Sequence, residues 1–248
     1  MIPKKGFLFT ANLETTIFRP RGDGPFPVVI INHGKQWGNP RFQRRFRPEA
    51  AARYFLERGY LVLAPMRQGF SNSTGNYIGA GCNIESNGLV QAHDDEAVLQ
   101  YVATLPYADS ARVLVVGESH GGWTTLALGT LHPEGVRGLV NFAGGLRQDG
   151  CVAWENTLAR AAGAYGRHTT LPSLWLYGDN DSLFSPDTFN AMHRAYTAAG
   201  AHAKLVDYGT FGNDAHRLFD EPAGRPVWEP ELTRFLTEVG LPSKPVQR

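Results

Sequence analysis

Six short apolar runs alternate with longer helical patterns along most of the chain. Such runs, rich in β-branched residues and without polar alternation, are typical of strands that are buried on both faces. A helix after each strand returns the chain so that the next strand lies parallel to it. The sequence therefore predicts an α/β fold with a mostly parallel, doubly wound sheet of about eight strands and helices on both faces. The six runs are residues 28–32, 60–64, 112–117, 136–142, 174–177 and 203–207.

The 248 residues suit a single domain, 1–248, of this kind. The alternation of residues 7–18 predicts an antiparallel hairpin before the first buried strand, with Leu8-Phe9-Thr10 opposite 14–18. Residues 144–170 are expected to form a small cap insertion over the ligand site, which should lie beyond the carboxyl ends of the strands. The expected helices are residues 50–58, 89–105, 121–132, 186–199 and 228–239.

The charges are nearly balanced, with 24 basic and 23 acidic side chains and a formal net charge of +1. This balance gives no electrostatic footprint for nucleic acid or for an anionic membrane surface. No apolar run approaches the ~20 residues that span a bilayer, and the first residues have no apolar core of a signal peptide. We therefore expect neither a nucleic-acid nor a membrane partner, and a monomer or homodimer; a mature chain whose leader was removed stays open.

The run Gly117-Glu118-Ser119-His120-Gly121 stands between a predicted strand and a predicted helix. In that setting Gly-x-Ser-x-Gly makes a strained turn that exposes the serine Oγ, and side chains in place of the glycines would collide with the crossing backbone. The amide of His120, at the start of the helix, can then stabilise an oxyanion. The pattern indicates a nucleophilic serine; a strand-to-helix turn without chemistry is the alternative.

Four further motifs follow the predicted strands in order: Asn32-His33-Gly34, Arg67-Gln68-Gly69-Phe70-Ser71, Gly178-Asp179-Asn180-Asp181 and Asp214-Ala215-His216. With the serine motif, they resemble the α/β-hydrolase superfamily and, within it, the dienelactone hydrolase-like family, over about residues 7–239. The resemblance implies an α/β-hydrolase fold and a reaction that needs no metal and no cofactor. Enzymes close to dienelactone hydrolase itself use a cysteine nucleophile, so the serine here favours ordinary esters over the dienelactone.

The same resemblance implies the other members of a catalytic triad. The family's acid follows a strand as Gly-x-x-Asp, which places Asp181 in that role; Asp179 is its rival, and Asp207 is a weaker one. Among eight histidines, His216 follows the last strand in a glycine-containing loop, which gives the chain order Ser, Asp, His of this fold. We therefore expect Ser119 as nucleophile, His216 as base and Asp181 as orienting acid.

Alignment of His33-Gly34-Lys35 with the family's His-Gly-x implies that the amide of Lys35 joins that of His120 in the oxyanion hole, with Gln36 as the alternative to Lys35. Several aromatic residues fall in or near loops expected at the mouth of the site, which would suit a small or aromatic, for example phenolic, ester. Trp123 is better explained as a core residue under the nucleophile helix. The expected substrate-binding residues are Gln36, Trp37, Phe70 and Trp154.

Three other functions stay open; one of them, a lipase, is disfavoured because the sequence shows no long exposed apolar lid. The run Arg67–Gly75 also resembles the prolyl-oligopeptidase-like branch, which implies a serine peptidase or amidase, although those enzymes usually carry a large extra domain. A binding protein that kept the fold and lost the chemistry is the third reading, and the presence of all three triad candidates argues against it.

Cys82 and Cys151 both fall in loops expected at the carboxyl edge of the sheet, where a bridge between them is conceivable. Unpaired buried thiols are the alternative. Their settings, Gly-Cys-Asn and Asp-Gly-Cys, resemble those of exported dienelactone hydrolase-like proteins, which implies a disulfide and a periplasmic or secreted location.

Overall fold

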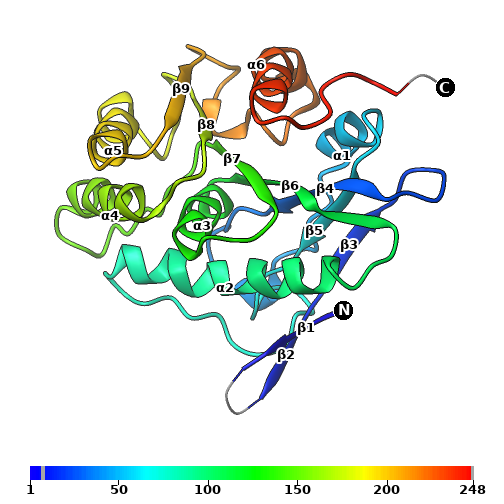
Figure 1. Ribbon diagram of the computed structural model, residues 1–248. Helices are drawn as coiled ribbons and strands as arrows, with labels where there is room; N and C mark the ends of the chain where they lie inside the picture. The colour runs from blue at the N-terminus through cyan, green and yellow to red at the C-terminus, as the bar shows by residue number, and fades with distance from the viewer. Residues whose placement is uncertain (7–8, 247–248) are drawn as a thin grey trace.

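A seven-stranded sheet forms the centre of the computed structural model, which describes residues 1–6 and 9–246. The strand order is β3-β5-β4-β6-β7-β8-β9, and only β3 is antiparallel to its neighbour (Figure 1). β6 lies in the middle, so the residues that follow it emerge at the centre of the sheet edge. The strands are β3 (Thr15–Phe18), β4 (Phe26–Asn32), β5 (Leu61–Pro65), β6 (Ala108–Glu118), β7 (Val136–Phe142), β8 (Ser173–Tyr177) and β9 (Ala203–Asp207).

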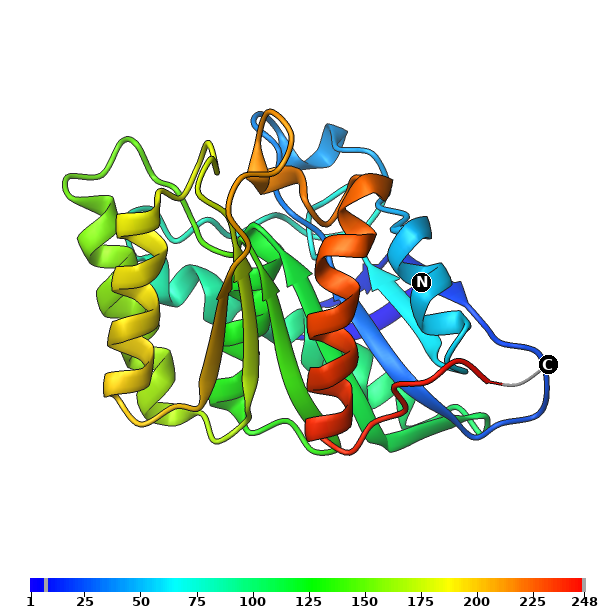
Figure 2. The ribbon, with the colours of Figure 1, turned by 90° about the horizontal axis from the view of Figure 1, so that it is seen from above.

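Helices cover both faces of the sheet, as the apolar strand runs predict. Val28 and Ile30 of β4 point into one apolar core, and Val29 and Ile31 point into the other. α1 and α6 pack on the second core and lie in front of the sheet in Figure 2, whereas the other helices pack on the first. The helices are α1 (Glu49–Leu56), α2 (Ile84–Val102), α3 (His120–Leu128), α4 (Trp154–His168), α5 (Pro186–Ala198) and α6 (Arg225–Glu238), with 3₁₀ turns at Pro40–Phe42, Gly129–Leu131, Ala215–Arg217 and Pro222–Gly224.

The N-terminal hairpin differs from the prediction. β1 (Ile2–Lys5) pairs with β2 (Thr10–Leu13) in a separate two-stranded sheet, and residues 15–18 instead form β3 at the edge of the main sheet. The chain changes partner at Glu14 because Ile2 and Leu13 are both buried in the core under α2. Leu8 of the expected hairpin lies outside the described residues.

The segment 144–170 contains a loop and a helix. Residues 144–153 form the loop after β7, and α4 packs lengthwise along α5 and contacts α2. The apolar face of α4, with Leu158 and Ala162, is part of the first core. Helix α2 begins at Ile84, five residues before its predicted start, because the Asn83 side chain accepts a hydrogen bond from the Ser86 amide and caps it.

Candidate active site

Ser119 occupies the sharp turn between β6 and α3, with φ 51° and ψ −124°. A non-glycine residue adopts such a backbone only where the surroundings enforce it. The enforcement comes from close backbone packing: an added Cβ at Gly117 would lie 2.2 Å from the Gly121 oxygen, and one at Gly121 would lie 2.3 Å from the Asn32 oxygen. Glycine on both sides of Ser119 is therefore a steric requirement, as the motif predicts.

The turn is also tied to the neighbouring strand. The Ser119 amide donates to the Phe142 oxygen at 2.9 Å, and the Ser119 carbonyl accepts from the Gly145 amide at 3.1 Å. Both partners lie at or just after the carboxyl end of β7. These bonds fix the serine at the centre of the sheet edge, where the loops after the strands gather.

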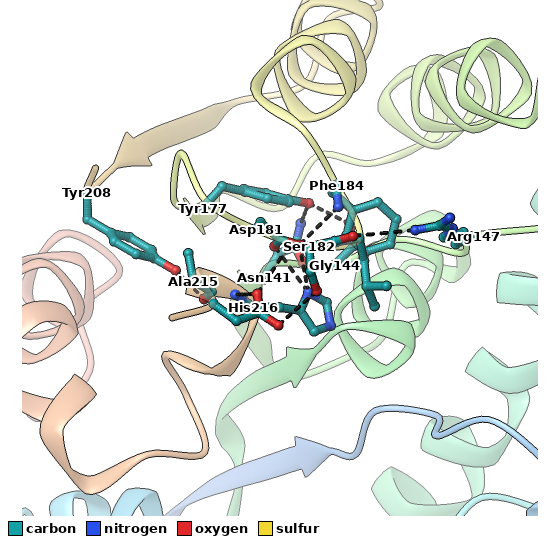
Figure 3. A network of polar contacts seen from close by, with 12 residues as sticks. Asn141, Gly144, Arg147, Tyr177, Asp181, Ser182, Phe184, Tyr208, Ala215 and His216 are labelled. Atoms are coloured by element: carbon teal, nitrogen blue, oxygen red, sulfur yellow. Dashed lines mark hydrogen bonds and ion pairs between the residues drawn. The ribbon is translucent and has the colours of Figure 1, made fainter. Parts of the chain in front are cut away.

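Asp181 and His216 contact each other directly (Figure 3). Nδ1 of His216 lies 3.1 Å from both carboxylate oxygens of Asp181, so the ring donates from Nδ1 and leaves Nε2 free to accept a proton. Asp181 is buried, and its Oδ1 also accepts from the amides of Leu183 (2.8 Å) and Phe184 (2.9 Å). The carboxylate is thus held rigidly against the imidazole.

The two rival acids lie elsewhere. Asp179 is exposed, and its amide donates to the Gly209 oxygen. Asp207 ends β9 and accepts from the Gly209 amide. Among the described residues, Asp181 is the acid whose carboxylate contacts the His216 ring.

Asp214 stands two residues before His216, in a motif to which the sequence assigns no role apart from the base. Its Oδ1 accepts from the amides of His216 and Ser182, both at 3.0 Å, and Oδ2 accepts from the Ser182 hydroxyl at 2.8 Å. Burial alone would raise the pKa of Asp214, but the hydrogen bonds from Ser182 and His216 lower it below its ordinary value. The charged Asp214 side chain thus connects the loop that carries His216 to the loop that carries Asp181.

The segment 33–36 after β4 lies against the nucleophile, since an added Cβ at Gly34 would lie 3.3 Å from the Ser119 Cβ. The Gly34 amide donates to Glu118 Oε1 at 3.1 Å, and the Gln36 amide donates to Gln43 Oε1 at 3.2 Å. Within residues 1–6 and 9–246, the amides of Lys35 and His120 have no protein acceptor. Of the two alternatives for the second oxyanion donor, this geometry favours Lys35 over Gln36.

A small pocket opens beside Ser119. Gln36 and Trp37, both predicted to bind substrate, line it, and Trp37 is 75% exposed. Phe70 does not reach it: the ring is fully buried and packs against His33 and Tyr77, because the loop after β5 turns inward. Trp154, also predicted to bind substrate, does not line the pocket; its ring packs against Phe184, with ring centroids 6.3 Å apart. The full lining is Lys35, Gln36, Trp37, Ser119, His120, Gly145, Leu146, Arg147, Leu183 and Phe184.

Phe184 links the pocket to the base, because its ring also lies against His216 at 5.7 Å between centroids. The sequence motifs assign no role to Phe184, Leu146 or Arg147. A larger cavity, about 700 Å³, lies at the opposite end of the strands, between α2 and the starts of β6 and β7. It contains none of the predicted site residues.

Residues 13–239 match the sequence profile described as Dienelactone hydrolase family. The chain belongs to the dienelactone hydrolase family. Within the α/β-hydrolase superfamily it is a hydrolase with serine, not cysteine, at the strand-to-helix turn.

Solved structures share the fold of this family member. A structure from Klebsiella pneumoniae, assigned as a dienelactone hydrolase, is 24% identical, with TM-score 0.65 and 92% of each chain covered. Est1E from Butyrivibrio proteoclasticus, with ferulic acid bound, is 16% identical, with TM-score 0.66 and 96% and 98% covered. A curated sequence from Grosmannia clavigera, named as a dipeptidyl-aminopeptidase B, is 37% identical over 106 residues; the match takes in 41% of this chain but only 10% of that protein.

A disulfide joins Cys82 to Cys151, with Cα atoms 5.7 Å apart, which confirms the expected pairing. It connects the loop that leads into α2 with residues 144–153, whose Gly145, Leu146 and Arg147 form one wall of the pocket. A hydrogen bond from the Gln148 side chain to the Gly81 oxygen, 3.0 Å, reinforces the link.

Within residues 1–6 and 9–246, no helix has the length and apolar character needed to cross a membrane.

Proposed function

We propose that this member of the dienelactone hydrolase family is a serine carboxylic-ester hydrolase. Ser119 attacks the ester carbonyl, His216 accepts its proton, and Asp181 orients the imidazole and stabilises its positive charge. The amides of Lys35 and His120 bind the oxyanion of the tetrahedral intermediate. His216 returns the proton to the leaving alcohol, and the same base then activates water to release the acid from Ser119.

The observation that carries the proposal is the backbone of Ser119. A serine held at φ 51° between two glycines that cannot be replaced has a conformation that no packing or solubility role requires. The Asp181–His216 pair supports it, because the free Nε2 of a histidine in the tautomer fixed by a carboxylate is a general base.

The pocket supports small or aromatic acyl groups as the substrates. Its wall combines apolar side chains, Leu146, Leu183 and Phe184, with the exposed ring of Trp37, and it is narrow. Est1E, which shares the fold, holds ferulic acid, a phenolic acid. We therefore include methyl ferulate and other phenolic esters in the substrate panel.

The test is hydrolysis of p-nitrophenyl esters graded by acyl length, next to methyl ferulate and to aminoacyl p-nitroanilides. We expect ester turnover that disappears in Ser119→Ala, together with labelling of the wild type at Ser119 by a fluorophosphonate. A protein that cleaves no ester and is not labelled would refute the proposal.

The acid is tested by a matched pair of variants. Asp181→Asn should lower kcat by on the order of 10⁴-fold, the loss that an Asp-to-Asn change causes in a serine protease triad. Asp179→Asn, an exposed carboxylate two residues away, should leave kcat near the wild-type value. The reverse result would move the role of acid to Asp179.

A serine peptidase is the second candidate. The local identity with the dipeptidyl-aminopeptidase B from Grosmannia clavigera supports it, although this chain spans a tenth of that relative's length. Turnover of the aminoacyl p-nitroanilides with higher kcat/KM than the esters would favour this reading over the esterase.

A further inference from the structure

Arg67 lies just beyond the carboxyl end of β5, and its side chain is fully buried. One guanidinium nitrogen donates to the His33 oxygen at 2.6 Å, and the other lies 3.1 Å from Nδ1 of His120. The Arg67 backbone amide also donates to Nε2 of His33 at 3.1 Å. One residue thus binds two segments that are separated by more than 80 residues of sequence.

Both rings accept these bonds in a defined tautomer. Nδ1 of His33 donates to the Gly34 oxygen at 2.6 Å, which leaves Nε2 as an acceptor. Nε2 of His120 donates to the Asn87 side-chain oxygen at 2.7 Å, which leaves Nδ1 to accept from Arg67. Burial, followed by the nearby Arg67 charge, lowers the pKa of both histidines well below the ordinary value, so both rings stay neutral.

Stability alone does not explain this arginine. Among the described residues, Arg67 makes no ion pair within 4.0 Å, and its Nε has no hydrogen-bond partner. A buried guanidinium without a directly bonded carboxylate is costly, and apolar side chains of similar volume often stabilise such a position better. Arg67 instead fixes the relative positions of its partners, because the planar guanidinium donates hydrogen bonds in fixed directions.

We propose that Arg67 is a positioning residue for the oxyanion hole, holding the segment that carries the Lys35 amide at a fixed distance from the amide of His120. This rests on the proposed esterase function, in which these two amides bind the oxyanion. Arg67 itself touches neither the substrate nor the reacting atoms: it acts through the His33 carbonyl and the His120 ring.

The role predicts a selective loss. If the two amides shift relative to each other, the transition state loses stabilisation while the ground-state ester binds as before. A displacement of about 1 Å at such a site lowers the rate by about 10²-fold. Arg67→Met should therefore lower kcat by about 10²-fold and change KM by less than about threefold.

Arg58 offers a matched control. It is also buried, at 4% exposed, and its guanidinium donates to the backbone oxygens of Tyr54 and Ser243 and pairs with Glu229. These partners lie beside α1 and α6, on the far side of the sheet from α3. Arg58→Met should lower the unfolding temperature and leave kcat and KM of the folded protein unchanged.

A second readout separates positioning from general damage. A trifluoromethyl ketone adds to the Ser119 Oγ and leaves a negatively charged oxygen, so it tests the oxyanion hole, whereas the neutral product alcohol tests ordinary binding. We expect Arg67→Met to weaken binding of the ketone by the same factor as it lowers kcat, and binding of the product alcohol by less than about threefold. Equal losses for both inhibitors, or an unchanged kcat, would overturn the proposal.

Arg67→Lys covers the case in which Arg67→Met fails to fold. The lysine keeps the charge, but a single ammonium cannot span the His33 oxygen and the His120 ring, so kcat should again fall selectively. Wild-type kcat in Arg67→Lys overturns the positioning role and leaves the esterase proposal intact. A wild-type protein that cleaves no ester and resists the fluorophosphonate overturns both.

Discussion

Asp95→Asn replaces one carboxyl oxygen by an NH2 group in the buried polar network behind residues 33–36 and His120, which we propose to form the oxyanion hole. Asp95 belongs to α2 and is fully buried; its Oδ2 accepts from the Asn32 side chain at 2.7 Å, and its Oδ1 has no hydrogen-bond partner. Burial raises the pKa of Asp95 to about 7, and the hydrogen bond from Asn32 and the charge of Arg67 offset this only in part. The folded protein therefore holds a proton here that the unfolded chain releases.

The sign and size of the effect follow from proton linkage. Between the ordinary pKa of 3.8 and the folded pKa of about 7, the folded state binds more protons than the unfolded state, so the free energy of unfolding falls as the pH rises. At about 1.4 kcal/mol per pKa unit, the Asp95 contribution falls by about 4 kcal/mol in total, of which about 3 kcal/mol falls between pH 4.5 and 8. Asparagine keeps the acceptor for Asn32 and removes the titration.

Urea unfolding followed by tryptophan fluorescence at pH 4.5, 5.5, 6.5 and 8 measures this. From pH 4.5 to 8, the free energy of unfolding of the wild type should fall by about 3 kcal/mol relative to that of Asp95→Asn. Asp109→Asn is the control. A hydrogen bond from Arg112 lowers the pKa of Asp109, so the difference in free energy of unfolding between Asp109→Asn and the wild type should not change with pH above 4.5. Parallel unfolding curves for the wild type and Asp95→Asn would show that Asp95 is ionised throughout and refute the reasoning.

Three further changes test the turn, the disulfide and the pocket. Gly121→Ala places a Cβ 2.3 Å from the Asn32 oxygen and should abolish soluble, active protein, whereas Gly150→Ala, with nothing within 4 Å, should behave as wild type in expression and ester turnover. Replacing Cys82 and Cys151 by serine opens a loop of 69 residues and should lower the free energy of unfolding by about 4 kcal/mol in urea titrations, an effect that dithiothreitol should reproduce in the wild type. Trp37→Ala removes a 75% exposed pocket side chain and should raise KM for aromatic esters severalfold with no change in unfolding temperature; an unchanged KM would exclude the ring from substrate contact.

The parallel strands could be predicted because burial on both faces leaves an uninterrupted apolar run in the sequence. β7 and β9 have the predicted bounds, and β8 begins one residue earlier than predicted. The first turn of α2 could not be predicted in this way, since Ile84-Glu85-Ser86-Asn87 has the composition of a loop. Its helical start depends on the side chain of Asn83, a local hydrogen bond that periodicity does not encode.

The proposed nucleophile, acid and base follow from local motifs, because each requires a particular turn with a recognisable spacing of glycine. The pocket wall does not, since Leu146, Arg147 and Phe184 meet Trp37 only when loops after different strands come together. Arg67 was quoted in a motif, yet its partners, the His33 carbonyl and the His120 ring, are set by tertiary packing. The sequence therefore predicts residues whose position depends on a local turn. It does not predict residues whose role depends on tertiary contacts with distant segments.

Helix α2 nevertheless carries a signal for the buried network. Asn87, Gln91, Asp94 and Asp95 stand at i, i+4, i+7 and i+8 and are all buried, so one stripe of the helix is polar where an apolar stripe would be expected. Three of these side chains bind groups outside the sheet: Asn87 accepts from the His120 ring, Gln91 donates to the Ile78 oxygen, and Asp94 accepts from the Gln68 amide. Asp95 instead accepts from Asn32, at the end of β4. Most buried polar side chains in folded proteins have at least one such hydrogen-bond partner. In this chain the polar stripe therefore marks the face of α2 that packs against the loop bearing Arg67, behind the segments that we propose to carry the oxyanion-binding amides.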